Sequence, residues 1–354
     1  MSTHNDLRLE QIGRFGVITL NRPNALNSLT HDMVRAIAAA LADWRLNGEI
    51  HAVLIRGAGD RAFCAGGDVR DIARKVTEGR LDEARAFFAD EYRQNWRVKR
   101  FPKPYVALMN GVVMGGGVGD SIHGDLRVVS EKTVFAMPET GIGLFPDVGG
   151  TYALPRLPGE LGMYLGLTGA RLGAADCLYA GIGTHFVPSA RMDELAEALL
   201  SLDDAREAQF ITRAIARFAA DPGEAPIAAC QETIDRLFAG TDLNTIRTRL
   251  RVTPGFAQEQ AAVLEEKAPF SVALTFAALR FGATLEFEDC QKLEYRMVSR
   301  IIARPDFAEG IRALLIDKDK QPKWQPATID LVDAGEVAAM SRELDDGDLR
   351  LDWH

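Results

Sequence analysis

Residues 111–150 read GVVMGGGVGDSIHGDLRVVSEKTVFAMPETGIGLFPDVGG, an apolar stretch that is interrupted by glycines and acids. The glycines at 115–117 let backbone N–H groups approach a ligand, because no Cβ stands in the way, and the small apolar residues after them can begin a helix. Such a turn can bind an oxyanion. Glu139 and Asp147 have aromatic and aliphatic neighbours, and poor solvation there raises the pKa of a carboxyl group toward the working pH. The stretch therefore predicts an active site that uses carboxylate chemistry.

An earlier part of the chain has the same order of strand, glycine turn and helix. HAVLIRG at 51–57 predicts a buried strand over residues 53–56, and AGDRAFCAGGDVRDI at 58–72 predicts a glycine-bearing turn before a helix that begins at about Asp68. PYVALMNG, GGG and VGDSIH repeat that order about fifty residues later. Two such turns can direct two backbone donors at one ligand atom. Tight turns between a strand and a helix also need glycine for structural reasons, so the residues alone leave both interpretations open.

The remaining elements alternate in a similar way. Residues 7–20 predict a β-hairpin, residues 30–47 a helix capped by Thr30, and residues 83–101 an amphipathic helix that ends before Pro102. Further strands are predicted at 126–130, 133–137 and 184–188. This alternation indicates an α/β fold. We expect a core with the active site over residues 1–200 and a helical C-terminal region over residues 201–354.

Composition limits the function classes. The chain has 354 residues, of which 47% are hydrophobic and 26% charged, and its net charge is -9 with no Lys/Arg run longer than two residues. These values argue against nucleic acid or an anionic membrane surface as the main partner. Four separated cysteines without a CxxC motif fit a reducing compartment and predict no metal site: Cys64, Cys177, Cys230 and Cys290. The beginning MSTHNDLRLE has no apolar signal core and no later run is long enough to span a membrane, so we expect a cytoplasmic protein.

Several familiar motifs are absent from the sequence. It has no GxGxxG, no glycine loop followed by GK[ST] and no GxSxG, which argues against nucleotide cofactors and a simple serine hydrolase. Asp147 precedes VGGTYAL, so a helix N-cap is a structural alternative for it, whereas Glu139 in its apolar run is harder to explain structurally. The separated histidines His123 and His185 are expected to be packed side chains and not ligands.

Five segments together resemble the crotonase superfamily, the enoyl-coenzyme A (CoA) hydratase and isomerase group: NRPNALNSL, FCAGGD, NGVVMGGGVG, MPETGIGLFPDVGG and LTGARL. The resemblance covers about residues 7–200. It implies a spiral of ββα turns with a helical C-terminal region. It also implies an oxyanion hole for the thioester oxygen, made by the N–H groups of Gly67 and Gly116. Preorganised donors of this kind contribute about 3 to 4 kcal/mol to transition-state stabilisation.

One departure from the hydratase pattern is informative. Hydratases of this group carry two glutamates; one matches Glu139, and the other falls three residues after the second oxyanion glycine, where this chain has Gly119. A single carboxylate cannot easily both hold a water and protonate the neighbouring carbon. The stretch after Pro138 and the segment FAEGIRALLIDKDKQPKWQP at 307–326 resemble the 3-hydroxyisobutyryl-CoA hydrolase branch. That branch implies Glu139 as the catalytic carboxylate, Asp147 near the substrate hydroxyl and Glu91 in the pocket lining.

We therefore expect hydrolysis of a short, branched 3-hydroxyacyl-CoA, with 3-hydroxyisobutyryl-CoA from valine breakdown as the leading substrate. Glu139 either attacks the thioester to form a mixed anhydride or activates water, and both routes stay open. CoA is part of the substrate, and no other cofactor and no metal are expected. Arg22 and Arg70 are expected near the CoA phosphates, although surface arginines are commonly only solvated. The alternatives are a hydratase or isomerase, or a catalytically silent acyl-CoA binder. The resemblance also implies a homo-oligomer, a trimer or hexamer.

Overall fold

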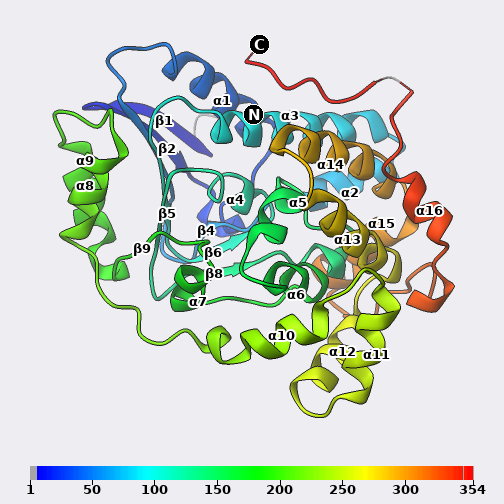
Figure 1. Cartoon of the computed structure of the whole chain (residues 1–354). Coiled ribbons are helices and arrows are strands. Elements are labelled where there is room, and N and C mark those ends of the chain that lie inside the picture. Colours follow the sequence, from blue (N-terminus) through cyan, green and yellow to red (C-terminus); the bar gives the residue numbers. More distant parts are fainter. Residues whose placement is uncertain (1–5, 346, 354) are drawn as a thin grey trace.

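A six-stranded sheet forms the frame of the N-terminal part of the chain (Figure 1). The computed structural model describes residues 6–345 and 347–353, so the first five residues of the N-terminal segment MSTHNDLRLE lie outside the described part. The strands, in their spatial order, are β1 (Leu7–Ile12), β2 (Phe15–Leu20), β3 (Ala52–Gly57), β5 (Tyr105–Met109), β7 (Leu126–Val129) and β9 (His185–Phe186). β1 and β2 are antiparallel, which confirms the predicted hairpin, and the other pairs are parallel.

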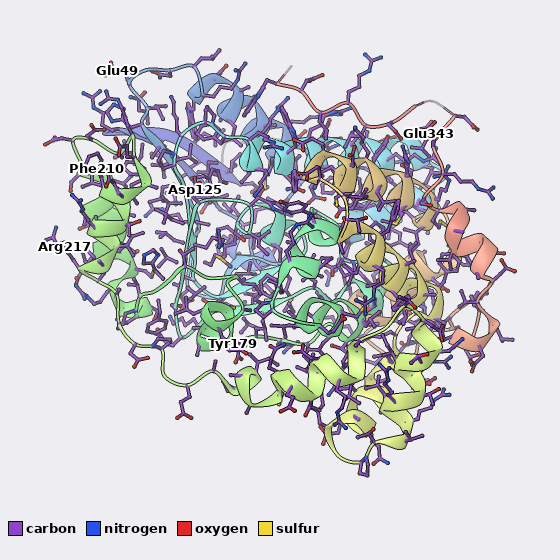
Figure 2. The ribbon with its side chains drawn as sticks, viewed as in Figure 1. Glu49, Asp125, Tyr179, Phe210, Arg217 and Glu343 are labelled. Carbon is purple, nitrogen blue, oxygen red and sulfur yellow. The ribbon has the colours of Figure 1, made fainter. Side chains whose placement is uncertain are left out.

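Neighbouring side chains along β2 point to opposite faces of this sheet and pack in different hydrophobic clusters. On β2, Ile18 belongs to the main hydrophobic cluster with the helices α1 (His31–Trp44) and α3 (Leu81–Lys99). Val17 on the same strand packs in a second cluster with α8 (Met192–Leu200) and α9 (Ala208–Ala216). Figure 2 labels Phe210 on α9 and Arg217 directly after it, at the outer edge of the molecule. Thr30 caps α1 as predicted, because its Oγ accepts the Met33 N–H at 3.2 Å.

A second sheet has three short parallel strands, β4 (Ala62–Cys64), β6 (Val112–Met114) and β8 (Val134–Ala136). β4 leads through Gly66 into α2 (Val69–Thr77), and β6 leads through Gly115 into α4 (Gly116–Gly119). Both glycines have positive φ, 108° and 49°, which favours glycine over other residues. Because parallel strands end at the same edge of a sheet, the two glycine turns meet there. This is the ββα repetition that the resemblance implied.

After β9, every helix or strand in the described part of the chain is a helix. Between β8 and β9 lie η2 (Glu139–Ile142), α5 (Gly150–Ala153), η3 (Leu154–Arg156), α6 (Leu161–Thr168) and α7 (Ala174–Tyr179), and η1 (Pro23–Ala25) precedes α1. The later helices besides α8 and α9 are η4 (Ser189–Arg191), η5 (Pro226–Cys230), α10 (Gln231–Phe238), α11 (Leu243–Val252), α12 (Phe256–Glu266), α13 (Pro269–Gly282), α14 (Phe287–Ile301), α15 (Pro305–Ile311), the π-helix η6 (Arg312–Ile316), η7 (Ile329–Leu331) and α16 (Ala334–Ala339).

The C-terminal helices return to the N-terminal part. α14 packs along α3 and α15 packs against α2, so residues far apart in sequence lie side by side (Figure 1). The main hydrophobic cluster includes both Tyr92 of α3 and Val298 of α14, and it crosses the predicted boundary near residue 200. That boundary stays a prediction. No helix among the described residues is long and apolar enough to cross a membrane.

Candidate active site

The two glycine turns and η2 enclose a cavity of about 260 Å³. The turns are in close contact: a Cβ placed on Gly116 would lie 3.4 Å from the backbone nitrogen of Gly67. Neither the Gly67 nor the Gly116 N–H donates a hydrogen bond within residues 6–345 and 347–353. Both residues line the cavity. The structure therefore brings the two predicted donors to one small space.

Glu139 is the first residue of η2 and also lines this cavity. Its side chain is buried, and its Oε2 has no hydrogen-bond partner in the described part of the chain. Its Oε1 lies 3.7 Å from the position that a Cβ on Gly115 would take. Burial raises the pKa of this carboxyl group well above 4.5, and the nearby Asp147 raises it further. An unpaired carboxyl group beside the glycine turns is suited to act as a base or a nucleophile.

Asp147 does not cap a helix, so this alternative is wrong. α5 begins at Gly150 with Gly149 as its N-cap, and no side chain caps it. The Asp147 carboxylate accepts instead a hydrogen bond of 2.7 Å from the Tyr92 hydroxyl of α3. Burial raises the pKa of Asp147 to about 6, against the opposing effect of the Tyr92 bond. Sequence analysis missed Tyr92, although it directly follows Glu91.

Glu91 extends from α3 into the same cavity and is buried. Its Oε1 has no partner among the described residues and lies 2.4 Å from the position of a Cβ on Gly116. Only glycine therefore fits at 116 without a shift of Glu91. Burial raises the pKa of Glu91 well above 4.5, and the nearby acids Asp147, Asp120 and Glu139 add to this effect.

The space beside Gly119 is filled by other side chains. A Cβ on Gly119 would lie 2.5 Å from Nδ2 of Asn95 and 2.9 Å from Cβ of Val148. Both neighbours are buried, so a glutamate at this position would require them to move. Asn95 was not expected from the sequence. The second glutamate of the hydratase pattern is therefore missing at position 119, and the packing of Asn95 and Val148 leaves no room for it.

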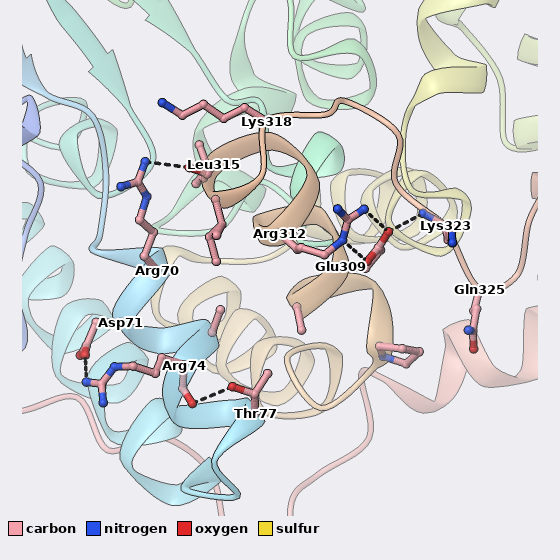
Figure 3. A pocket seen from close by; sticks show the side chains of 14 residues that line it. Arg70, Asp71, Arg74, Thr77, Glu309, Arg312, Leu315, Lys318, Lys323 and Gln325 are labelled. Atoms are coloured by element: carbon pink, nitrogen blue, oxygen red, sulfur yellow. Dashed lines mark hydrogen bonds and ion pairs between the residues drawn. The ribbon is translucent and has the colours of Figure 1, made fainter.

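A larger cavity of about 1200 Å³ adjoins the first at Leu315, which lines both (Figure 3). Its cationic lining residues are Arg70, Arg74, Arg312, Lys318 and Lys323. Asp71 and Glu309 pair with two of the arginines, Arg74 and Arg312. Arg70 donates a hydrogen bond of 2.9 Å to the Leu315 carbonyl. Lys318 and Lys323 have no ion pair within the described residues. This cavity offers several cations in a protein whose net charge is -9.

Arg22 lies elsewhere and is not among the lining residues of either cavity. Its guanidinium donates to the Ser28 carbonyl at 2.8 Å and pairs with Asp68 at 3.2 Å and with Asp6 at 3.5 Å. These acceptors leave it poorly placed for a phosphate. The expected role of Arg22 stays a prediction.

The two singled-out histidines are packed, as expected. His123 is buried, and its ring bonds the Val148 carbonyl at 2.8 Å through Nε2, while burial lowers its pKa to about 3. His185 lies on β9, and its Nδ1 is 2.9 Å from the Thr184 hydroxyl. Within the part of the chain that the structure describes, no group of three or more His, Cys, Asp or Glu side chains could hold a metal ion.

A spiral of ββα units with paired glycine turns and buried carboxyl groups at one cavity defines the crotonase class. A family model described as Enoyl-CoA hydratase/isomerase matches residues 15–340, and the chain belongs to this family. The "3-hydroxyisobutyryl-CoA hydrolase, mitochondrial" of Danio rerio is 44% identical over 353 residues, which cover 98% of this chain and 92% of the relative. The Homo sapiens protein of the same name is 41% identical over 361 residues, covering 99% and 93%.

Solved structures of the same fold carry other names. A carnitinyl-CoA dehydratase from Mycobacterium thermoresistibile is 40% identical with a TM-score of 0.90, over 97% of this chain and 98% of that chain. An enoyl-CoA hydratase from Rhodobacter sphaeroides 2.4.1 is 41% identical with a TM-score of 0.89, over 98% and 99%. Names alone therefore do not choose between hydrolysis and hydration.

The cytoplasmic location expected from the sequence is contradicted, because the curated relatives are named as mitochondrial proteins. The expectation rested on the lack of an apolar signal core. An apolar core marks the secretory route, and mitochondrial targeting segments are amphipathic instead. The lack of one could not distinguish cytoplasm from mitochondrion.

Proposed function

We propose that this chain hydrolyses a short, branched 3-hydroxyacyl-CoA thioester, with 3-hydroxyisobutyryl-CoA from valine breakdown as its substrate. One observation carries the proposal: the unpaired Glu139 carboxyl group stands beside two free N–H donors, while Asn95 and Val148 fill the space for a second glutamate at position 119. Hydrolysis needs one carboxylate, whereas syn-hydration of an enoyl thioester needs two groups in concert. The names of the curated relatives support the same choice.

The backbone donors and the carboxylate have different roles in the proposed reaction. The N–H groups of Gly67 and Gly116 bind the thioester oxygen and stabilise the negative charge that develops on it. Glu139 then attacks the carbonyl carbon, or removes a proton from the water that attacks it, and the CoA thiolate leaves. In the first route water hydrolyses the resulting anhydride. Both routes require an ionised Glu139.

Asp147 is suited to recognise the substrate hydroxyl. Tyr92 occupies one oxygen of its carboxylate, Oδ2, which leaves the other as an acceptor. The rest of the lining is largely apolar and includes Phe87, Phe88 and Ile142, which suits a branched acyl group.

The CoA moiety fits the larger cationic cavity. Its phosphates would pair with Arg70, Lys318 and Lys323, and its thiol arm would pass Leu315 to reach the glycine turns. Paired acids already neutralise Arg74 and Arg312 in part, so the other three cations are the stronger candidates. A homo-oligomer stays a prediction.

A panel of CoA thioesters tests the proposal. Free thiol is measured with a chromogenic reagent. In parallel, loss of the enoyl absorbance is measured with an unsaturated substrate. We expect rapid thiol release from 3-hydroxyisobutyryl-CoA and no hydration of the enoyl thioesters. Hydration of an enoyl thioester without thiol release would instead favour the hydratase or dehydratase activity for which the solved relatives are named. Binding without either signal would indicate a silent acyl-CoA binder.

A further inference from the structure

We infer that Glu294 of α14 is a positioning residue for Asp147, holding the loop that aims the Asp147 carboxylate into the cavity. This inference rests on the proposed function, in which Asp147 recognises the substrate hydroxyl. Glu294 is fully buried and lines neither cavity. Its role would be to fix the backbone next to Asp147 and not to touch the substrate.

The loop after Asp147 has an unfavourable backbone. Val148 has φ 51°, in the left-handed region that a β-branched residue rarely adopts. Gly149 follows with φ 83°, and a Cβ there would lie 2.3 Å from Nε2 of His123. Such a conformation persists only where surrounding contacts determine it. Asp147 directly precedes it, so those contacts also set the direction of the Asp147 side chain.

Glu294 supplies the largest set of these contacts. Its carboxylate accepts the Gly149 N–H at 2.8 Å, the Thr151 N–H at 3.0 Å and the Thr151 hydroxyl at 2.5 Å. The three donors lie within the four residues that follow Asp147. The His123 ring bonds the Val148 carbonyl from the other side at 2.8 Å. The loop is thus held between the Glu294 carboxylate and the His123 ring.

Gln291 lies one helical turn before Glu294 and faces the same loop. With its amide oriented to satisfy both neighbours, it donates to the Tyr92 carbonyl at 3.2 Å and accepts the Gly149 N–H at 3.0 Å. Tyr92 in turn donates its hydroxyl to Asp147 at 2.7 Å. One face of α14 therefore contacts both the loop that carries Asp147 and the residue that binds it.

The Glu294 carboxyl group is buried at an energetic cost, which argues for a role beyond packing. No cation pairs with it in the described part of the chain, burial raises its pKa to about 8, and Asp147 adds to the rise. An apolar side chain would avoid this cost of desolvation. The two oxygens of the carboxyl group accept all three donors of the loop, whereas an apolar side chain would accept none.

Glu294→Gln tests the inference, because an amide has a single acceptor oxygen and one of the two N–H groups loses its hydrogen bond to residue 294. We expect kcat/KM for 3-hydroxyisobutyryl-CoA to fall about tenfold or more, and that for isobutyryl-CoA, which lacks the hydroxyl, to fall less than about threefold. The matched control is Asp235→Asn on α10, where the carboxylate accepts the Glu160 N–H at 2.8 Å outside both cavities. It should leave both values unchanged.

Crystal structures of the parent and Glu294→Gln proteins give a second readout that does not depend on activity. We expect the contact between Tyr92 and Asp147 to lengthen or break in the variant. If Glu294→Gln does not fold, Thr151→Val removes one donor to Glu294 and should give a smaller loss with the same substrate preference. Equal losses on both substrates, or an unmoved Asp147, would overturn the inference. A parent protein that hydrolyses neither thioester would instead overturn the proposed function, and the crystal structures would still decide the role of Glu294.

Discussion

At Glu139, the proposed catalytic carboxyl group shares its cavity with two other buried carboxyl groups. Glu139, Asp147 and Glu91 line one cavity; burial raises the pKa of all three, and the charge of Asp147 raises the pKa of Glu139 and of Glu91 further. Because neighbouring charges interact, a change in the ionisation of Asp147 changes the pKa of Glu139. A base whose pKa approaches the working pH combines a sufficient ionised fraction with good basicity. The apolar lining therefore contributes directly to reactivity.

Glu139→Gln keeps the size of the side chain and removes its basic, nucleophilic oxygen. We expect kcat to fall roughly 10²- to 10⁴-fold, the usual contribution of a positioned general base, while CoA still binds. Stopped-flow measurement of thiol release gives kcat, and isothermal titration with CoA gives the affinity for CoA. Turnover near that of the parent would remove Glu139 from the mechanism. An enolate-forming isomerase would also depend on this residue, so product analysis must accompany the rates.

Asp147→Asn separates recognition of the hydroxyl from general chemistry. Loss of the charge weakens a charge-assisted hydrogen bond, so kcat/KM for the 3-hydroxyacyl substrate should fall about ten- to a hundredfold. An isobutyryl thioester has no hydroxyl, and its slower hydrolysis should change much less. Equal losses on both substrates would assign Asp147 a general role in the reaction. If the rates on both substrates are unchanged, Asp147 has no role in the reaction beyond its hydrogen bond with Tyr92.

The acidic limb of the pH profile should reflect the raised pKa of Glu139. The pKa of Glu139 is raised above 4.5, so this residue stays protonated at a higher pH than an ordinary glutamate does. As the pH falls through this raised pKa, kcat/KM should therefore decline. Asp147→Asn removes a nearby negative charge and should move this limb to lower pH. Rates with a pantetheine thioester between pH 4.5 and 8 avoid the titration of the CoA phosphate. A limb that stays in place or moves to higher pH would contradict the proposed coupling.

At the scale of elements, the pairing of β4 with β6 brings the two proposed oxyanion donors together. A thioester bound between them should have a weakened carbonyl bond. With a 13C-labelled carbonyl group in the slow Glu139→Gln variant, we expect the infrared carbonyl stretch to shift to lower frequency than in water. Gly116→Pro would remove one donor, but its Cβ would lie 2.4 Å from Glu91 Oε1, so this variant disturbs more than one group. An unshifted stretch would contradict the oxyanion assignment.

Local patterns predicted much of this arrangement. The hairpin, α1 with its Thr30 cap and the two glycine turns depend on neighbours in sequence, which propensity and periodicity describe. β4 was not predicted, because three residues are too few to show a period. Asp147 was also open to a cap interpretation, since DVGG resembles a helix start. Its partner Tyr92 lies 55 residues away, and no local pattern joins them.

At the scale of the molecule, the C-terminal helices complete the site. Glu294 reaches the loop after Asp147 across more than 140 positions, and Lys318 comes to the same cavity as Arg70 across a much longer separation. Sequence reasoning gave helices in this region but could not say what they contact, because helix packing depends on three-dimensional shape. The predicted region over residues 201–354 thus contributes residues to both the positioning of Asp147 and the larger cavity.

That cavity gives the last prediction, which concerns CoA binding. Lys318→Ala and Lys323→Ala should each raise KM for the CoA thioester about three- to tenfold, as expected for a partly exposed charge pair, with kcat unchanged. The pantetheine thioester lacks the nucleotide phosphates, so its KM should stay the same in both variants. Lys292→Ala is the matched control, because this exposed lysine pairs with Asp289 and lies outside the cavity.

Salt gives an independent readout of the same contacts. Raising the ionic strength from about 0.05 to 0.5 M shortens the screening length from more than 10 Å to less than 5 Å, so KM of the parent for the CoA thioester should rise. The rise should be smaller in Lys318→Ala, because one of the screened interactions is already lost. If both lysine variants raise KM for the pantetheine thioester as much as for the CoA thioester, they act by deforming the segment around Leu315. If neither variant changes KM, the phosphates lie elsewhere, and Arg22 becomes the residue to test.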